Sequence, residues 1–285
     1  MARPSRFSEE QILEMYNKYI NGDSSIKIAK EYNTSASTIM SLFKSRKMST
    51  RNCSVAAQKY KVDNTFFSDI NTEEKAYWLG FIYADGYIST VNKRNTFGIA
   101  LALKDIKHLE KLKNSINSTH PIKIYKQSNG YIEGQEYCKL TINNKELISD
   151  LRSQGVVENK TNIITAPTIN ASLASHFIRG YMDGDGCISY NSQRDEYSIK
   201  ILGTNDILNY ISDFIEDNLC ISVNPYTKRK KDQTVSCLEM CGNIQSLKFL
   251  NAIYKNATIC LDRKYLRYKN LCNKYSVEPN GNIGC

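Results

Sequence analysis

Two aspartates, Asp85 and Asp185, lie 100 residues apart in matching surroundings. Each follows an apolar run that predicts a buried helix, so each carboxylate is expected at a helix C-terminus. A helix C-terminus carries roughly half a negative charge and disfavours a carboxylate. Two such carboxylates at equivalent places indicate a compensating cation, and paired aspartates with main-chain carbonyls suit Mg²⁺. The other matching residues are Gly80 and Gly180, Gly86 and Gly186, and Ile88 and Ile188.

The two predicted helices carry small residues four positions apart, which places them on one helix face. These residues are Gly80 with Ala84, and Gly180 with Gly184. Small residues let a second helix approach closely. If the helices pack through these faces, both carboxylates come together. Gly86 and Gly186 are predicted to end the helices in the left-handed conformation.

Segments 79–86 and 179–186 resemble two copies of the LAGLIDADG motif. Over about residues 72–273 the chain resembles the two-motif, single-chain homing endonucleases of that family. The resemblance implies a site-specific endonuclease that hydrolyses both strands of a long, pseudo-palindromic site in double-stranded DNA. The first copy departs at Tyr83, where the family often has an acid, but that position is not the metal ligand.

The resemblance also implies the parts of the site. It implies a divalent metal, Mg²⁺ with Mn²⁺ as a substitute, that activates a water for in-line attack. The implied ligands are the carboxylates of Asp85 and Asp185 and the main-chain carbonyls of Ala84 and Gly184. Lys160 and Lys264 resemble by position the lysine that stabilises charge in the family.

After each aspartate the hydrophobic pattern changes to a period of two, which predicts strands. Each repeat is therefore predicted as αββαββα in an α+β fold, over residues 72–166 and 167–275. The resemblance implies that the two antiparallel sheets form a DNA-binding saddle. The residues expected to contact DNA are Lys123, Tyr125, Lys139 and Lys200, with Lys228, Arg229, Lys230 and Lys231 at a hairpin tip.

Residues 1–50 are predicted to form a small all-α helix-turn-helix domain. The stretch 25–39 is similar to the helix-turn-helix of resolvase-like DNA-binding modules, although a generic three-helix cap is the alternative. The expected DNA contacts are Ser35, Ser37, Thr38, Ser41, Lys44 and Arg46. Residues 51–71 are expected to be a basic linker, and residues 276–285 a polar tail.

Composition agrees with a DNA-binding protein. The 285 residues carry a formal net charge of +9, which favours a polyanionic partner. No apolar run approaches the ~18 residues of a membrane span, and no signal sequence begins the chain, so a cytoplasmic protein is expected. The family resemblance implies a monomer with internal pseudo-two-fold symmetry. Nine cysteines without CxxC spacing predict reduced thiols rather than disulfides or a zinc site.

Two other functions fit part of the pattern. A transcription regulator that has lost cleavage combines the same two kinds of domain, but it needs no pair of acids at the helix ends. An RNA maturase uses a nuclease-like fold, and the added DNA-reading module disfavours it. The paired Asp85 and Asp185 therefore favour the endonuclease.

Overall fold

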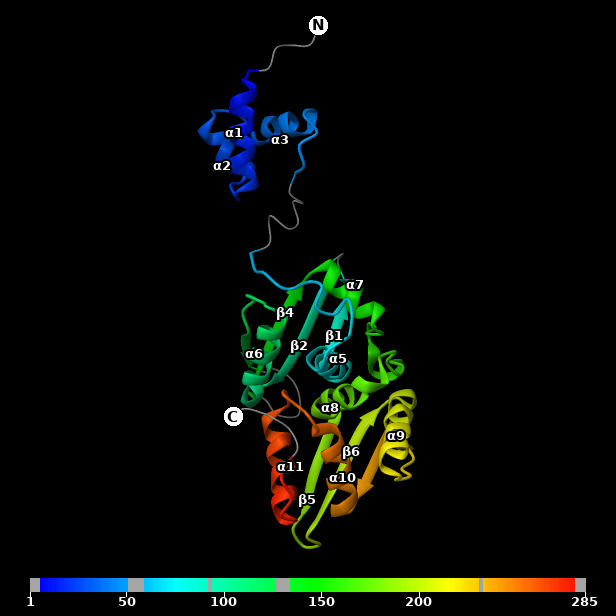
Figure 1. The fold of residues 1–285 in the computed structure, drawn as a ribbon. Helices are drawn as coiled ribbons and strands as arrows, with labels where there is room; N and C mark the ends of the chain where they lie inside the picture. The colour runs from blue at the N-terminus through cyan, green and yellow to red at the C-terminus, as the bar shows by residue number, and fades with distance from the viewer. Residues whose placement is uncertain (1–5, 51–58, 92–93, 127–133, 231–232, 280–285) are drawn as a thin grey trace. The chain divides into compact units, whose positions relative to one another are not determined.

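The computed structural model describes residues 6–50, 59–91, 94–126, 134–230 and 233–279, and it consists of two compact units (Figure 1). Unit 1 is Met1–Lys59 and unit 2 is Tyr60–Cys285. The helices are α1 (Glu9–Ile20), α2 (Ser25–Glu31), α3 (Ala36–Ser45), α5 (Glu73–Asp85), α6 (Ile106–Ser115), α7 (Lys145–Ser153), α8 (Ala174–Asp185), α9 (Asn205–Leu219), α10 (Asn243–Tyr254) and α11 (Asp262–Lys274). The strands are β1 (Gly86–Ser89), β2 (Thr96–Ala102), β3 (Lys123–Lys126), β4 (Glu136–Asn143), β5 (Gly186–Asn191), β6 (Glu196–Gly203), β7 (Tyr226–Lys230) and β8 (Gln233–Cys241).

Unit 1 is a three-helix cluster with its own core. Each helix begins at a serine whose side chain accepts a hydrogen bond from the first turn: Ser8, Ser24 and Ser35. Such caps satisfy main-chain donors that the helix leaves free. Apolar side chains at helical spacing, with Ile12 and Phe43 at their centre, are buried together. The three helices form where the sequence predicts them, and their use as a helix-turn-helix stays a prediction.

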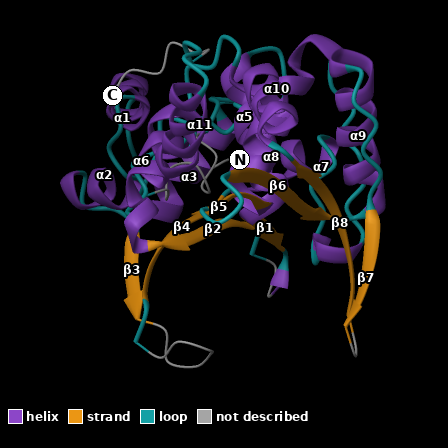
Figure 2. Ribbon diagram, turned by 90° about the horizontal axis from the view of Figure 1, so that it is seen from below, coloured by secondary structure: helices purple, strands orange, loops and turns teal. Residues whose placement is uncertain are grey.

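Unit 2 contains two four-stranded antiparallel sheets with the same topology. The strand orders are β1-β2-β4-β3 and β5-β6-β8-β7. Figure 2 shows the strands of both sheets as a curved layer, with the helices of this unit on one side of it. The order αββαββα occurs twice, and the α+β fold with two pseudo-symmetric repeats is confirmed. Helix α11 follows the second repeat and has no counterpart after α7.

Helices α5 and α8 form the centre of unit 2. The two main chains approach each other closely at two glycines that occupy equivalent places in the repeats. A Cβ added to Gly80 would lie 2.0 Å from the carbonyl oxygen of Phe177, and one added to Gly180 would lie 2.0 Å from that of Tyr77. Only glycine allows this contact, because every other residue carries a Cβ. The predicted packing of the two small-residue faces is therefore present.

The glycines that follow the two helices do not adopt the predicted left-handed conformation. Gly86 has φ −75° and Gly186 has φ −91°, which is extended backbone. Glycine is needed there for space. A Cβ at Gly86 would lie 2.8 Å from the carbonyl oxygen of Ile82, and one at Gly186 would lie 2.4 Å from that of Met182. The chain passes from helix directly into strand, which fixes each aspartate beside the first strand residue.

Part of the stretch 51–71, expected as a linker, packs in unit 2. Phe66, Phe67 and Ile70 are buried in its core, and the main-chain N–H of Asp63 donates to the carbonyl of Ile116. Residues 51–58 lie outside the described part, as do residues 280–285 of the expected tail. Apolar side chains thus anchor the chain well before α5 begins. Within the described residues, no helix combines the length and hydropathy that a membrane span requires.

Candidate functional site

The structure brings the two aspartates together at the centre of unit 2. Helices α5 and α8 run side by side and end at Asp85 and Asp185. At their ends, a Cβ added to Gly184 would lie 2.2 Å from the Cβ of Ala84 and 3.3 Å from Oδ2 of Asp85. The carboxylate of one repeat therefore lies against the helix end of the other. This is the juxtaposition that the small-residue spacing predicted.

Both carboxylates have pKa values above the ordinary range. Burial is the main cause of the raised pKa of Asp85, to about 6, and the negative charge of Asp185 contributes as well. Burial also raises the pKa of Asp185, while Lys160 and Lys264 act against it. Two carboxylates that disfavour each other's ionised form are stabilised by a bound cation. The electrostatics of the pair thus support a positively charged ligand.

The two predicted lysines donate to different numbers of carbonyls at the helix ends. Lys264 of α11 is only 3% exposed, and its Nζ donates to the carbonyls of Met182 at 2.6 Å, Asp183 at 2.6 Å and Gly184 at 3.2 Å. Lys160, in the short turn after α7, is half-buried and donates to the carbonyl of Ala84. Burial lowers the pKa of both lysines, that of Lys264 to about 8.

The residues present fit a hard divalent cation such as Mg²⁺. Two carboxylates lie where two helix C-termini add negative partial charge, and such oxygen donors are what this cation prefers. The carbonyls of Ala84 and Gly184 already accept from the lysines. A carbonyl oxygen has two lone pairs, so each could also contribute to a cation. The four donors all come from the last two residues of α5 and α8.

A pocket of about 290 Å³ opens beside Asp185 and joins the two repeats. Its lining includes Ala84 and Lys160 from the first repeat and Tyr181 from the second. Lys160 and Asp185 therefore face one shared space.

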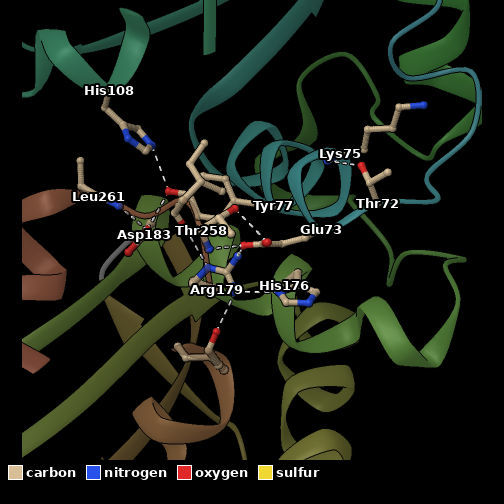
Figure 3. A network of polar contacts seen from close by, with 12 residues as sticks. Thr72, Glu73, Lys75, Tyr77, His108, His176, Arg179, Asp183, Thr258 and Leu261 are labelled. Carbon is tan, nitrogen blue, oxygen red and sulfur yellow. Dashed lines mark hydrogen bonds and ion pairs between the residues drawn. The ribbon is translucent and has the colours of Figure 1, made fainter. Parts of the chain in front are cut away.

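A buried polar network, which the sequence reasoning missed, joins α5 to α8 (Figure 3). Arg179 is fully buried, and its guanidinium donates to Glu73 Oε1 at 2.7 Å and to the carbonyls of Ile253 and Ile259 at 2.8 and 3.0 Å. Glu73 also accepts from the main-chain N–H of Thr258 at 2.6 Å. An arginine inside an otherwise apolar helix was the available signal, because a buried guanidinium needs a partner.

Asp183, four residues after Arg179, belongs to the same network (Figure 3). Its Oδ2 accepts from the hydroxyl of Tyr77 and from the main-chain N–H of Leu261, both at 2.7 Å. The hydroxyl of Tyr77 lies 3.0 Å from Nε2 of His108, which must then carry the proton. Tyr83 occupies the equivalent place in the first repeat and donates to the carbonyl of Gln154 at 2.7 Å. Asp183 is therefore a packing residue of α8, separate from the paired carboxylates.

The predicted DNA contacts of the first repeat lie on the sheet face opposite the helices. Lys123 and Tyr125 on β3 are exposed, and they pair across the strands with Lys139 and Tyr137 on β4. The two tyrosine rings stack with centroids 5.4 Å apart, and Lys139 lies over the ring of Tyr87. At these described positions the face presents cations and aromatic rings.

The predicted contacts of the second repeat are placed differently. Lys200 on β6 forms an ion pair with Glu239 on β8, with 2.9 Å between Nζ and Oε1. Sequence reasoning did not single out Glu239. The backbone of residues 228–230 belongs to β7, while the side chains of Lys228, Arg229 and Lys230, and all of Lys231, lie outside the described part.

The predicted contacts in unit 1 gather on and around α3. Ser35 is the N-cap of α3, with its hydroxyl 2.7 Å from that of Ser37, and Arg46 forms an ion pair with Glu9. The exposed members are Ser35, Ser37, Thr38, Ser41 and Lys44. Arg46 is half-buried and held by α1, so it differs from the freely exposed cation that the sequence suggested.

No protein-family model matches the sequence, and no curated protein matches it. Solved structures resemble the fold. They include the I-LtrWI LAGLIDADG homing endonuclease bound to target DNA, with 13% identity, 75% of this chain and 90% of that chain covered, and a TM-score of 0.47. They also include I-DmoI in complex with DNA and Ca, with 16% identity, 73% of this chain and 99% of that chain covered, and a TM-score of 0.46. A third is the N-terminal LAGLIDADG domain of DUF199/WhiA, with 18% identity, 72% of this chain and 93% of that chain covered, and a TM-score of 0.44. Likenesses this distant assign no activity, so the function is argued from the side chains of this chain.

Proposed function

We propose that this protein is a divalent-metal-dependent endonuclease that hydrolyses both strands of a long site in double-stranded DNA. The observation that carries the proposal is the meeting of Asp85 and Asp185 at the paired ends of α5 and α8. Two carboxylates at two negative helix ends are unfavourable unless a cation joins them. The net charge of +9 supports the polyanionic substrate.

The chain's own groups would bind and orient the reacting phosphates. A divalent cation, when bound, would supply an activated water and stabilise the leaving oxygen. Asp85 and Asp185 would hold the cation, with the carbonyls of Ala84 and Gly184 as further donors. Lys160 lines the pocket beside Asp185, where its ammonium group would stabilise charge on the phosphate. The two sheets would lie along the DNA and place one phosphate of each strand near the aspartates.

A cleavage assay on a library of randomised duplexes tests this function. We expect Mg²⁺ to give linear products at one long site, and Ca²⁺ or chelator to give binding with little or no cleavage. Site-specific binding without cutting in any divalent metal would move the protein to the regulator class. Binding of structured RNA with no selective binding of duplex DNA would instead favour the maturase function.

Replacing each of the two lysines by methionine is expected to affect a different property, the cleavage rate for Lys160 and the stability for Lys264. Lys160→Met should lower the cleavage rate about 100-fold, because Lys160 lines the pocket beside Asp185, and should lower the stability less than Lys264→Met does, because its ammonium group donates to one carbonyl rather than three. Lys264→Met should lower the free energy of unfolding by about 2–4 kcal/mol, because it leaves three carbonyls at the end of α8 without their buried donor. Single-turnover cleavage and urea unfolding measure the two effects.

The exposed Lys248 on α10 provides the matched control, and Lys248→Met should change neither quantity. If Lys160→Met cuts at the wild-type rate, Lys160 has no part in the chemistry. If Lys264→Met is as stable as the wild type, its three hydrogen bonds do not support the fold.

We propose in addition that unit 1 binds the DNA backbone through α3. The exposed side chains of Ser37, Thr38 and Lys44 support this, since hydroxyls and ammonium groups are common phosphate donors. Lys44→Gln should weaken DNA binding and reduce the slope of log Kd against log salt by about one. Lys30→Gln, on α2, is the control. Equal salt slopes for wild type and Lys44→Gln would remove Lys44 from the interface.

A further inference from the structure

Two cross-strand pairs on the exposed sheet surface differ in charge between the repeats. On the first repeat, Lys123 lies directly across from Lys139, so two cations are neighbours. On the second repeat, Lys200 lies directly across from Glu239, and their side chains form an ion pair of 2.9 Å. The hydroxyl of Tyr226 also donates to Glu239. At these described positions the first repeat presents two cations, and the second repeat presents a cation and an anion side by side.

The strand register shows which positions of the repeats are equivalent. Gly86 pairs with Ile99 in the first sheet, and Gly186 pairs with Ile201 in the second. Lys200 and Glu239 therefore correspond to Gly98 and Thr141, which also pair with each other and carry no charge. The ion pair is thus a property of the second repeat alone. Lys200 pairs on its other side with Cys187, two residues beyond Asp185. The pair accordingly lies close to the proposed cleavage centre.

A carboxylate on a surface that covers DNA is unfavourable for affinity. It repels phosphates, and at 2.9 Å it neutralises a lysine that could otherwise bind one. A carboxylate is useful on such a surface for reading bases, since in the major groove it accepts a hydrogen bond from cytosine N4. Lysine donates to guanine O6 and N7. In a G·C base pair these groups are neighbours, as Lys200 and Glu239 are on strands β6 and β8.

We propose that Lys200 and Glu239 together select one G·C base pair in the half-site bound by the second repeat, an inference that rests on the proposed function. Lys200 donates to the guanine and Glu239 accepts from the cytosine. A carboxylate has about four acceptor sites, so it can accept from a base as well as from partners such as Lys200 and Tyr226. The first repeat, with Gly98 and Thr141 at the equivalent place, does not select this pair. The two half-sites of the target therefore differ near the centre of the site.

Selection of full-length protein on randomised duplex DNA in Ca²⁺ tests the inference, followed by competition binding on the selected site. The wild type should fix one G·C pair near the centre on one side only, with a preference over A·T of roughly 5- to 150-fold. Glu239→Met should reduce that preference to less than about threefold. It should also bind mismatched duplexes more tightly than the wild type does, because it frees the charge of Lys200. Lys200→Met should lose the same preference without this gain.

Lys139→Met is the matched control on the first repeat, where we expect weaker binding of all duplexes and unchanged base preferences. Thermal unfolding confirms that each variant is folded before binding is compared. If Glu239→Met keeps the wild-type preference at every position, the inference is wrong while the endonuclease proposal stands. If the wild type enriches no sequence at all, both are wrong.

Discussion

Replacing Asp85 or Asp185 by asparagine is expected to lower the rate of DNA cleavage on the order of 1000-fold or more, with DNA binding retained. The reason is that each change removes one of the two anionic donors at the meeting point of α5 and α8. A catalytic divalent cation contributes several kcal/mol to the transition state, which corresponds to this loss in rate. Single-turnover cleavage and gel-shift binding in Ca²⁺ measure the two properties.

The same substitution should stabilise the metal-free protein at neutral pH. The pKa of Asp85 is raised from 3.8 to about 6, so its ionised form favours the unfolded state. The stability associated with the protonated group is fully present below pH 3.8 and is lost as pH rises through about 6. A shift of this size corresponds to about 3 kcal/mol at most. In chelator, Asp85→Asn should therefore unfold at a higher temperature than the wild type at pH 7, and this gain should vanish near pH 4.

The same unfolding experiment is repeated with a divalent metal in place of the chelator. Mg²⁺ should raise the unfolding temperature of the wild type, because it binds the folded state, and should have little effect on the double variant Asp85→Asn/Asp185→Asn. Asp213→Asn, an exposed substitution on α9, should alter neither cleavage nor the response to metal. A variant of Asp85 that unfolds in chelator at pH 7 more readily than the wild type would identify the carboxylate as a structural group.

The largest expected loss of stability comes from Gly80→Ala or Gly180→Ala. Each added methyl group would lie 2.0 Å from a main-chain carbonyl oxygen of the facing helix. Main-chain atoms in a packed helix pair cannot turn aside, so α5 and α8 must separate. Overpacking costs about 1–3 kcal/mol where the core can adjust, and we expect at least the upper end here. Urea unfolding measures the stability, and cleavage should fall with it because the aspartates are drawn apart.

Gly98→Ala is the matched control for the same chemical change. Its Cβ would meet the side chain of Tyr87, with the hydroxyl at 2.4 Å, and that side chain is only half-buried. The ring can turn away, so a loss below about 1 kcal/mol is expected. Equal losses for Gly80→Ala and Gly98→Ala would show that the main-chain contact between α5 and α8 is not the limiting one.

The position of the paired carboxylates was predictable from the sequence for a local reason. An apolar run predicts a buried helix, and small residues four apart predict the face through which it packs. The last residue of each helix, Asp85 or Asp185, must then lie beside the end of the facing helix. Strand periodicity likewise fixed the order αββαββα in both repeats. These features depend on spacing along one segment, and spacing is what a sequence displays directly.

Contacts between distant segments were decided by the tertiary structure. The sequence treated Lys160 and Lys264 alike, yet one reaches a single carbonyl beside a pocket and the other is buried against three. It gave no sign that Glu239 would face Lys200 on a neighbouring strand. It suggested a left-handed Gly86 where the packed helix end requires an extended one.

By itself, then, the sequence determined the repeat, the elements of the two αββαββα units and the pairing of the two aspartates, but it did not predict α11. The tertiary structure alone decided that Lys160 and Lys264 lie at the ends of these helices and that Glu239 neutralises Lys200. It also decided how Arg179, Glu73 and Asp183 join α5 and α8. The physical reason is that a charge takes its role from the groups around it. Those groups come from segments whose separation along the chain carries no information about their distance in space.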